Sequence, residues 1–355
     1  MQCGITDRMD AVSSVAVIRV DSSEQIGSGH LMRCLTLAEQ MRKKNAEVHF
    51  ISRDLIGSLH RMVTEHGFSL HLLPRHEMQA NLTGYAAWLT VLQTMDAEET
   101  ATILRQIPPV DRLVVDSYAL DIVWEQQMRS LVREIFVIDD LANRQHDCDI
   151  LLDQNFYREM QYRYDGLVPP KCKLLLGPPH ALLREEFYAA RAHLRKRDGR
   201  LRRILVFYGG SDATCETEKA IHALLQLHLP SVDVDVVVGG SNPQRTYIEN
   251  LCASHGFLHY HCQVSHMAQL MANADLGLGA GGTTSWERCF LGLPTIVTAI
   301  AENQFEVCRD CAEAGLIHYL GKWDEVTAAD LMRAVSKYMN PKLLKDFQQT
   351  CSIHM

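Results

Sequence analysis

Short hydrophobic runs alternate along this chain with longer segments whose apolar residues recur at helical spacing. The first run, Val15–Val20, is rich in β-branched residues and is typical of a buried parallel strand. In the next segment, 30–44, Leu31 and Leu35 lie one helical turn apart and the last turn is basic, as the helix dipole favours. A second run, 47–52, completes a strand–helix–strand unit.

The same alternation continues through the chain. Further strands are predicted at 112–116, 134–139 and 149–153, and then at 203–208, 232–238, 275–279 and 293–298. Helices are predicted around 217–226 and up to Leu291. This order predicts an α/β fold made of two Rossmann-like domains that face each other across a cleft.

The domain boundaries follow from breaks in this pattern. We expect the first domain at 14–180 and the second at 203–340. The very basic stretch between them, 181–202, is predicted to be a solvated linker helix and not a DNA-binding element. A tail at 341–355 remains, and its helix, expected at 343–349, is predicted to return and pack on the first domain.

Composition narrows the functional classes. The chain has 355 residues with 35 Lys+Arg against 43 Asp+Glu, a net charge of −8, which argues against nucleic-acid or stable membrane partners. No apolar run approaches the ~18 residues of a transmembrane helix, and the start of the chain has no signal-peptide hydrophobic region. The 11 cysteines are scattered, which favours a reducing cytoplasm.

The first loop that could carry chemistry joins the first strand to the first helix. It contains Gly27, Gly29 and His30, at the edge where open parallel sheets bind ligands. Its two glycines are one short of a dinucleotide fingerprint, so an NAD site is a weak interpretation. Histidine titrates near neutrality and can take a proton from water. From spacing alone, a capping or packing role for His30 is equally compatible.

Two loops of the second half have the character of phosphate sites. Gly210 and Ser211 lie between a strand and a helix, although a tight turn without a ligand explains them as well. The loop with Gly281, Gly282 and Thr283 opens a helix and suits a diphosphate. Glu287, in that helix, can accept the hydroxyls of a ribose. Asn303 and Gln304 follow the next strand, so we expect them at the same edge.

Metal sites are weakly indicated. Cys308 and Cys311 have ligand-like spacing but lie in a helical stretch without a second pair. The cluster of His259, His261, Cys262 and His266 is explained as easily by alternation along a strand. The neighbouring carboxylates 139 and 140 point to opposite faces and are not expected to converge. No metal and no cofactor are therefore predicted.

Together these segments resemble the UDP-sugar hydrolases of pseudaminic acid biosynthesis, which have the glycosyltransferase B fold. The longest match is 19–34, Arg-Val-Asp-Ser-Ser-Glu-Gln-Ile-Gly-Ser-Gly-His-Leu-Met-Arg-Cys. Further matches follow in order at 115–118, 138–140, 146–152, 166–169, 181–187, 209–212 and 303–304. The resemblance runs from about residue 18 to 315. Residues 1–13 and those beyond Lys322 carry no motif of the family.

The resemblance implies hydrolysis of UDP-2,4-diacetamido-2,4,6-trideoxy-β-L-altropyranose to UDP and the free sugar, with inversion. It assigns His30 as general base, with no metal or cofactor. Supporting or sugar-contacting positions are Asp21, Gly27, Gly29, Arg33, Asp116, Tyr118, Asn303 and Gln304. UDP-binding positions are Gly210, Ser211, Gly281, Gly282, Thr283 and Glu287. The expected partner is this UDP-activated sugar, and a monomer is favoured.

Two other functions remain open at this stage. A glycosyltransferase, like the N-acetylglucosaminyltransferase of peptidoglycan synthesis, would share the fold and the loops of the second half. It would need an acceptor and a membrane-facing patch on the first domain, and no clear apolar patch is visible in the sequence. A nucleotide-sugar binding module without catalysis is the third hypothesis, and the presence of His30 with both phosphate loops counts against it.

Overall fold

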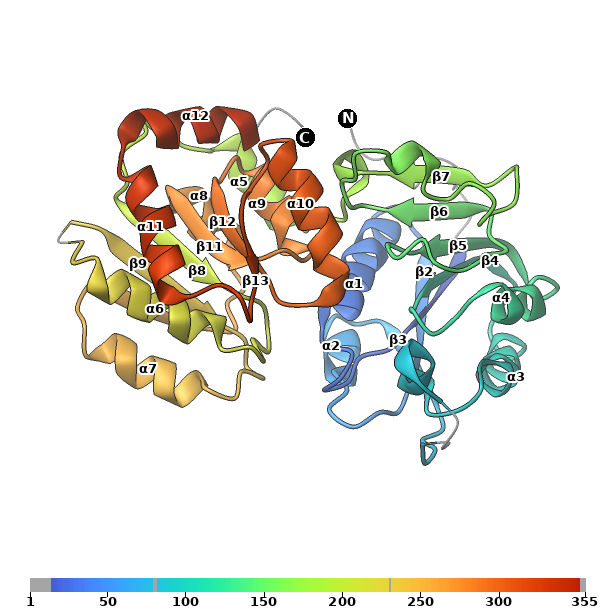
Figure 1. The fold of residues 1–355 in the computed structure, drawn as a ribbon. Coiled ribbons are helices and arrows are strands. Elements are labelled where there is room, and N and C mark those ends of the chain that lie inside the picture. The colour runs from blue at the N-terminus through green and yellow to red at the C-terminus, as the bar shows by residue number, and fades with distance from the viewer. Residues whose placement is uncertain (1–13, 79–81, 230, 352–355) are drawn as a thin grey trace. The chain divides into compact units, whose positions relative to one another are not determined.

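The structure is a computed structural model that describes residues 14–78, 82–229 and 231–351. The chain forms two compact units (Figure 1). The first unit contains the described residues up to Asn155 and the segment Glu159–Leu182. The second contains Phe156–Arg158 and the chain from Leu183 onward. Each unit is described separately below.

A parallel seven-stranded sheet in the order β3-β2-β1-β4-β5-β6-β7 forms the centre of the first unit. Its strands are β1 Val15–Val20, β2 Glu47–Arg53, β3 Ser69–Leu73, β4 Val110–Asp116, β5 Val132–Ile138, β6 Ile150–Asp153 and β7 Lys173–Leu176. Its helices are α1 Gly29–Arg42, α2 His60–Glu65, α3 Gln93–Leu104 and α4 Ile122–Met128. Short 3₁₀ turns lie at η2 Gly84–Leu89, η3 Met160–Tyr162 and η4 Pro178–His180.

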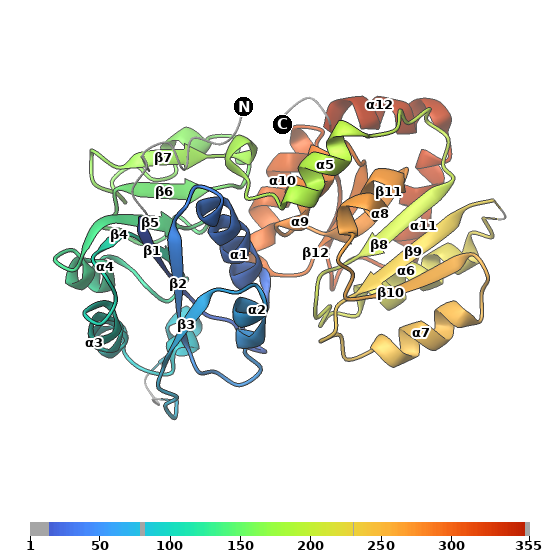
Figure 2. The ribbon, with the colours of Figure 1, turned by 180° about the vertical axis from the view of Figure 1, so that it is seen from behind.

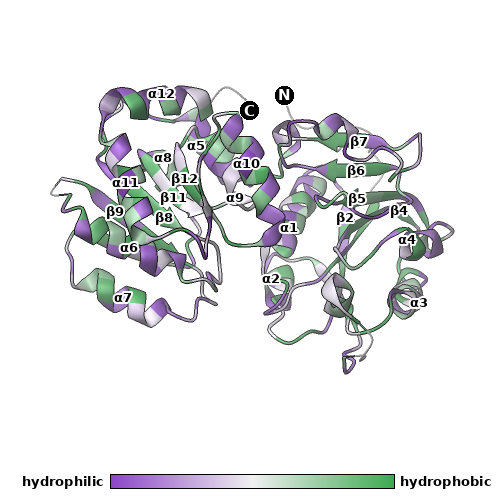
Figure 3. Cartoon of the chain, viewed as in Figure 1, coloured by the Kyte–Doolittle hydropathy of each residue, from purple (hydrophilic) through white to green (hydrophobic). Residues whose placement is uncertain are grey.

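Helices cover both faces of this sheet. Leu31 and Leu35 of α1, with Val63 of α2, pack on the face that carries Ile18 of β1. Helices α3 and α4 pack on the opposite face, where Trp124 of α4 is fully buried. The strands are therefore apolar on both faces, as Figure 3 shows by their green colour. This explains why they read as continuous hydrophobic runs.

The strand order reverses between β1 and β4. From β1 the chain builds outward through β2 and β3, and from β4 it builds the other way through β5, β6 and β7. The register pairs Val20 with Asp116, so the loops after both strands leave the sheet side by side. Open parallel sheets bind ligands at such a switch point, at the carboxyl edge.

The second unit repeats this plan with a parallel six-stranded sheet in the order β10-β9-β8-β11-β12-β13. The strands are β8 Arg203–Phe207, β9 Asp233–Val238, β10 Leu258–Cys262, β11 Leu276–Ala280, β12 Thr295–Ala299 and β13 His318–Lys322. The helices are α5 Glu185–Ala192, α6 Glu216–Gln226, α7 Arg245–Ala253, α8 Met267–Asn273, α9 Thr284–Phe290, α10 Phe305–Glu313, α11 Ala328–Tyr338 and α12 Pro341–Cys351, with a 3₁₀ turn at η5 Glu302–Gln304. Helices α6, α7 and α11 pack on one face, and α5 and α8, in front in Figure 2, pack on the other.

The predicted fold class is confirmed: both units are Rossmann-like α/β domains. Every predicted strand overlaps an observed one. The set of predicted strands lacks β3, β7, β10 and β13, the outermost strands of the two sheets, and the alternation in β10 was considered only as an alternative to a metal cluster. Most of their residues are only partly buried, so these strands have no continuous hydrophobic run to reveal them.

The helix expected over 181–202 is much shorter than predicted. Only Glu185–Ala192 is helical. Of the basic residues that follow, Arg195, Lys196, Arg200 and Arg202 are exposed, as predicted, whereas Arg197 is partly buried. The guanidinium of Arg197 donates to the carbonyl oxygens of Met271, Ala274, Leu291 and Gly292 at 2.7–3.0 Å. Backbone carbonyl oxygens of the second unit therefore hold Arg197, and with it this segment, in place.

The tail helix exists, but its predicted packing on the first domain is wrong. In α12, Leu344 is fully buried in the core of the second unit, which also contains Tyr338 of α11. The ring of Phe347 lies 5.2 Å from that of Tyr338. The apolar face of α12 therefore completes the second unit. None of the helices in the described part of the chain combines the length and apolar character needed to cross a bilayer.

This packing predicts a contrast between two adjacent leucines. Leu344→Ala should lower the free energy of unfolding by about 2–5 kcal/mol, because it leaves a cavity under α12. Leu343→Ala is the matched control: Leu343 is 39% exposed, so its loss should be under about 1 kcal/mol. Urea unfolding of both variants checks this, and equal losses would contradict the assigned packing.

Candidate active site

A buried ion-pair cluster lies at the switch point of the first unit. Asp116 ends β4 and is almost fully buried. Its Oδ1 lies 2.6 Å from Nδ1 of His30, in the first turn of α1. Arg33, one turn further along α1, donates from Nε to Asp116 Oδ2 at 2.6 Å and from Nη2 to Oδ1 at 2.7 Å. Helical spacing thus aims both side chains at one carboxylate.

A second carboxylate and a phenol extend the cluster. Arg33 Nη1 lies 3.1 Å from Oδ2 of Asp140, which follows β5. The hydroxyl of Tyr118 donates to Asp140 Oδ1 at 2.5 Å. The ring of Tyr118 stands edge-on to His30, with ring centroids 4.6 Å apart. Arg33 therefore links the ends of β4 and β5, and Tyr118 closes the cluster beside the imidazole.

Electrostatics keep the Asp116 carboxylate charged. Burial alone would raise its pKa, but Arg33 and then His30 outweigh burial and hold the pKa well below its usual range. Burial and the neighbouring Asp140 carboxylate raise the pKa of the Tyr118 phenol well above its usual range. At neutral pH, Asp116 is thus an acceptor and Tyr118 a donor.

This charge state fixes the orientation of the imidazole. A carboxylate without a proton can only accept, so His30 Nδ1 bears the hydrogen and donates to Asp116. The other ring nitrogen, Nε2, then carries a lone pair, and among the described residues it has no hydrogen-bond partner. The His30 side chain is 10% exposed. An aspartate that holds an imidazole in this way prepares Nε2 to act as a general base.

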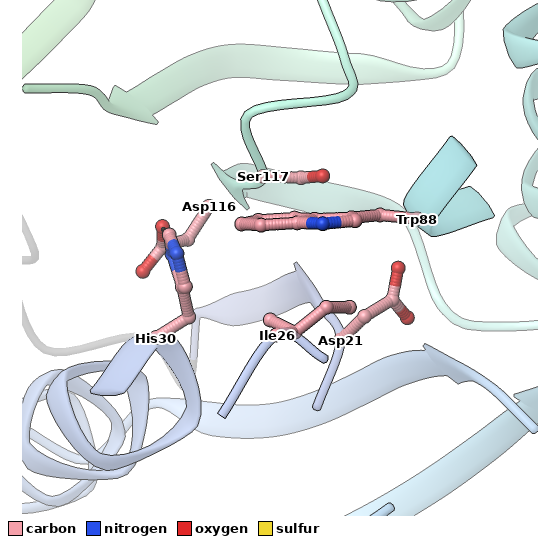
Figure 4. Close-up of a pocket in the computed structure, with 6 residues that line it drawn as sticks. All are labelled: Asp21, Ile26, His30, Trp88, Asp116 and Ser117. Carbon is pink, nitrogen blue, oxygen red and sulfur yellow. Dashed lines mark hydrogen bonds and ion pairs between the residues drawn. The ribbon is translucent and has the colours of Figure 1, made fainter. Parts of the chain in front are cut away.

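His30 and Asp116 line a small pocket (Figure 4) together with Asp21, Ile26, Trp88 and Ser117. Trp88 belongs to η2, and its ring lies edge-on to that of His30, with centroids 5.9 Å apart. About 150 Å³ of space not filled by protein atoms lies between these residues, part of it open to solvent. The imidazole of His30 therefore borders a shallow, partly open hollow.

A second buried network supports Asp21 from below. Its Oδ1 accepts from Arg19 Nη1 at 2.6 Å and from the backbone N–H of Arg53 at 2.7 Å. Both arginines are fully buried and also pair with Asp96, which accepts the indole N–H of Trp124 as well. Burial raises the pKa of Asp96, but the two arginines reverse this and lower it. This network fixes the position of Asp21 in the lining of the pocket.

The loop residues around His30 are mainly structural. The backbone N–H of Gly27 donates to the carbonyl of Ser23 at 2.9 Å, and Gly27 has φ +78°, which favours glycine. Ser23 Oγ accepts from the N–H of Ile26 at 3.0 Å. Gly29 is the first residue of α1. This tight turn directs Ile26 toward the pocket and starts the helix that carries His30.

In the second unit, the predicted loops also lie at the switch point, after β8 and β11. Phe207 pairs with Gly279, so both loops leave the sheet side by side. Gly210 packs against the loop after β9, where Ser241 Oγ donates to its carbonyl at 3.1 Å. Ser211 is exposed. The carboxylate of Asp212 accepts from two backbone N–H groups at the start of α6, so this aspartate caps the helix.

The glycine loop after β11 is close-packed. Gln304 Oε1 accepts from the N–H of Gly281 at 3.2 Å, and a Cβ on Gly281 would clash with Cys308. A Cβ on Gly282 would lie 3.6 Å from Gln304 Nε2. Thr283 immediately precedes α9, and Asn303 lies beside Gln304 in η5. These predicted residues therefore gather around one loop.

Charged side chains flank this loop. Glu287 of α9 accepts from Arg184 through Oε1, and burial raises the pKa of Glu287. Arg288 is buried behind the loop and donates to the carbonyl of Ala280 at 2.5 Å. Burial lowers the pKa of Arg288, and no carboxylate in the described part of the chain forms an ion pair with it. Its charge therefore favours an anion nearby.

The structure thus brings the predicted residues together in two sets, one in each unit. In the first unit, Asp21, His30 and Asp116 line the pocket, and Arg33 and Tyr118 contact them. The set in the second unit consists of Gly210, Ser211, Gly281, Gly282, Thr283, Glu287, Asn303 and Gln304. The described residues contain no group of three or more His, Cys, Asp or Glu side chains that could hold a metal ion.

Sequence reasoning missed four residues of the first set: Ile26, Trp88, Ser117 and Asp140. The adjacent carboxylates of Asp139 and Asp140 were not expected to converge, and they pair with different arginines: Asp139 with Arg144 and Asp140 with Arg33. The signal for Asp140 was its position directly after β5, at the same edge as Asp116. Trp88 had no such signal, because it lies in an irregular segment far from the motifs.

Comparison with known proteins confirms the resemblance expected from the motifs. The chain is 26% identical over 260 residues to the UDP-2,4-diacetamido-2,4,6-trideoxy-β-L-altropyranose hydrolase of Campylobacter jejuni, covering 73% of this chain and 82% of that protein. It is 25% identical over 307 residues to an uncharacterized protein of Methanocaldococcus jannaschii, covering 84% of this chain but only 57% of the relative's length. No protein-family model matches the chain.

A comparison of structures confirms the fold. The crystal structure of MurG from Acinetobacter baumannii superposes with a TM-score of 0.65 at 16% sequence identity, covering 97% of this chain and 95% of MurG. Both units are included in this match. The chain therefore has the two-domain glycosyltransferase B fold.

The cluster predicts how Asp116 affects stability with pH. Asp116→Asn should lower the free energy of unfolding at pH 7 by about 3 kcal/mol, because it breaks buried ion pairs. The pKa of Asp116 is lower in the folded protein than in the unfolded chain, where it is about 4. The Asp116 carboxylate therefore stabilises the folded protein fully above about pH 4, and this stabilisation is lost as the pH falls from there through the folded-state pKa. The difference from wild type should therefore narrow below about pH 4.

Urea unfolding between pH 7 and pH 3 measures this difference. The exposed Asp165 provides the matched control, and Asp165→Asn should change stability by about 0.5 kcal/mol or less throughout. A difference for Asp116→Asn that stays constant as the pH falls would contradict the assigned charge pairing.

Proposed function

We propose that this protein is a metal-independent hydrolase that cleaves the sugar–UDP bond of UDP-2,4-diacetamido-2,4,6-trideoxy-β-L-altropyranose with inversion. The observation that carries the proposal is the His30–Asp116 pair in a pocket at the switch point, in which Nε2 of His30 has no hydrogen-bond partner among the residues that the structure describes. The similarity to the Campylobacter jejuni hydrolase supports the substrate. The scattered cysteines favour a cytoplasmic location.

In the proposed reaction, His30 Nε2 removes a proton from water while the water oxygen forms a bond to the anomeric carbon. The bond from that carbon to the β-phosphate oxygen breaks, and UDP leaves with the electron pair. Asp116 stabilises the imidazolium that forms and keeps its orientation. Because water attacks opposite to UDP, the anomeric configuration inverts. One positioned base contributes about 10²–10⁴ in rate.

The second unit is proposed to hold UDP. Backbone N–H groups and hydroxyls of the loops at Gly210 and Gly281 suit the diphosphate, and the buried Arg288 adds positive charge behind the second loop. Glu287 is proposed to accept the ribose hydroxyls through Oε2, since Arg184 occupies Oε1. Tyr118 and Asn303 are proposed as sugar contacts.

These groups explain why no metal is needed in the proposal. UDP is a good leaving group without protonation, and oriented backbone N–H groups stabilise the charge that develops on it. The proposal assigns charge stabilisation to the two loops and to the buried Arg288 behind the second of them.

A glycosyltransferase with the same fold is the alternative, in which an acceptor hydroxyl would replace water. The likeness to MurG supports the fold alone and does not favour transfer. The two functions differ in whether an acceptor is required.

Proton NMR of the protein with the UDP-sugar, in EDTA and without acceptor, tests the proposal. We expect free UDP to appear together with the sugar anomer of opposite configuration. Turnover that starts only after an acceptor is added would identify a transferase. Activity that EDTA removes and Mg²⁺ restores would contradict the metal-free mechanism.

The role of His30 is tested by substitution. His30→Ala should lower kcat by about 10²–10⁴ because the general base is lost, while the Kd of UDP measured by calorimetry stays unchanged. His66→Ala is the control, since His66 lies at the surface of the same unit and its side chain is 42% exposed. A folded His30→Ala protein with wild-type turnover would remove His30 from the mechanism.

A further inference from the structure

Among the described residues, one buried carboxylate oxygen of a residue that lines the pocket has no hydrogen-bond partner. Asp21 is 3% exposed, and its Oδ1 accepts from Arg19, from the backbone N–H of Arg53 and from Ser52 Oγ at 3.4 Å. Its Oδ2 is buried and has no hydrogen-bond partner among the described residues. A buried acceptor without a donor costs free energy, so an unpaired oxygen of this kind calls for an explanation.

The position of Asp21 suggests the explanation. Figure 4 shows the Trp88 ring edge-on, with Asp21 and Ile26 on one side of the ring plane and Ser117 on the other. His30 and Asp116 lie beside the edge of the ring. Arg19 donates to Asp21 and is itself held by Asp96. Asp21 therefore cannot turn away from the pocket without breaking this buried network.

The charge of the pocket selects the part of the substrate that enters it. Asp21 and Asp116 place two carboxylates in its lining, each paired with a buried arginine, so the lining offers hydrogen-bond acceptors and no unpaired positive charge to attract a phosphate. Trp88 and Ile26 offer apolar contacts that suit the C–H groups of a sugar ring. A neutral sugar with one hydrogen-bond donor directed at Asp21 fits all of these features.

We infer that Asp21 is a specificity-determining residue whose Oδ2 accepts a hydrogen bond from an N–H or O–H donor of the sugar bound against Trp88 and beside His30. The inference rests on the proposed function and adds a substrate contact to it. The sugar in the name of the Campylobacter jejuni relative offers three such donors, namely two acetamido N–H groups and one hydroxyl. Each of them can satisfy the buried oxygen.

Asp21→Asn tests the contact. The variant can keep an oxygen toward Arg19 but presents an NH₂ group in place of Oδ2, so two donors would face each other. We expect KM for the UDP-sugar to rise about tenfold or more. The kcat should change by less than about threefold, and the Kd of UDP should stay unchanged.

Ser52→Ala is the matched control. It removes the Ser52 hydroxyl from Asp21 Oδ1 and leaves Oδ2 untouched, so KM, kcat and the Kd of UDP should all match wild type. A KM that rises as much in Ser52→Ala as in Asp21→Asn would assign Asp21 a structural role and overturn the inference.

Substrate analogues identify the donor without any substitution. In two analogues one acetamido N–H is replaced by an ester oxygen, and in a third the hydroxyl is removed. With the wild-type protein, one of the three analogues should raise KM as much as Asp21→Asn does with the parent substrate. For this analogue, KM should be the same in Asp21→Asn as in the wild type. If none of the analogues raises KM of the wild-type protein, the inference is overturned, even where Asp21→Asn does not fold.

The remaining outcomes separate the inference from the proposed function. A fall in kcat at unchanged KM in Asp21→Asn would mean that Oδ2 orients water, which overturns the sugar contact. If wild type releases no UDP, the proposed function fails, and the Kd of the intact UDP-sugar decides the inference. A Kd about tenfold weaker in Asp21→Asn would then support it, and an equal Kd would overturn it.

Discussion

The buried carboxylate of Asp116 is the interaction on which the candidate active site depends. It ends β4 directly opposite Val20, at the place where the strand order reverses. From there it accepts from His30 Nδ1 and Arg33, and from the thiol of Cys34 at 3.4 Å, three groups that α1 presents together. The two carboxylate oxygens of Asp116 therefore determine the tautomer of His30, balance the charge of Arg33 and hold α1 against the sheet.

The sequence predicts those parts of the fold that use local patterns. Central strands such as β1 and β4 are buried on both faces and read as continuous apolar runs. Asp116 ends β4, Asp21 follows β1, and His30 lies in the first turn of α1. Edge strands such as β3 escape detection because their residues are only partly buried. The basic stretch around Arg197 has helical propensity, but carbonyl oxygens of the second unit hold it in a non-helical path.

The finer details of the site depend on tertiary contacts. Trp88 reaches the pocket from a 3₁₀ turn between β3 and α3, and no spacing connects it with His30. The free Oδ2 of Asp21 is visible only once the partners of Oδ1 are known. The two units also use equivalent switch points differently: carboxylates and an imidazole line the first, whereas glycines, hydroxyls and a buried arginine surround the second.

Arginine side chains hold the non-helical segment after α5. Arg195 donates to the carbonyl oxygen of Asn273 and pairs with Asp275. Arg197 donates to four backbone carbonyls, one each from Met271, Ala274, Leu291 and Gly292, and thereby gives a segment without its own hydrogen-bond ladder a fixed path. A lysine has a single nitrogen with three donors and could not reach all four carbonyls. The local opening of this segment, and with it its amide exchange and exposure to proteases, therefore depends on the contacts of these two guanidinium groups.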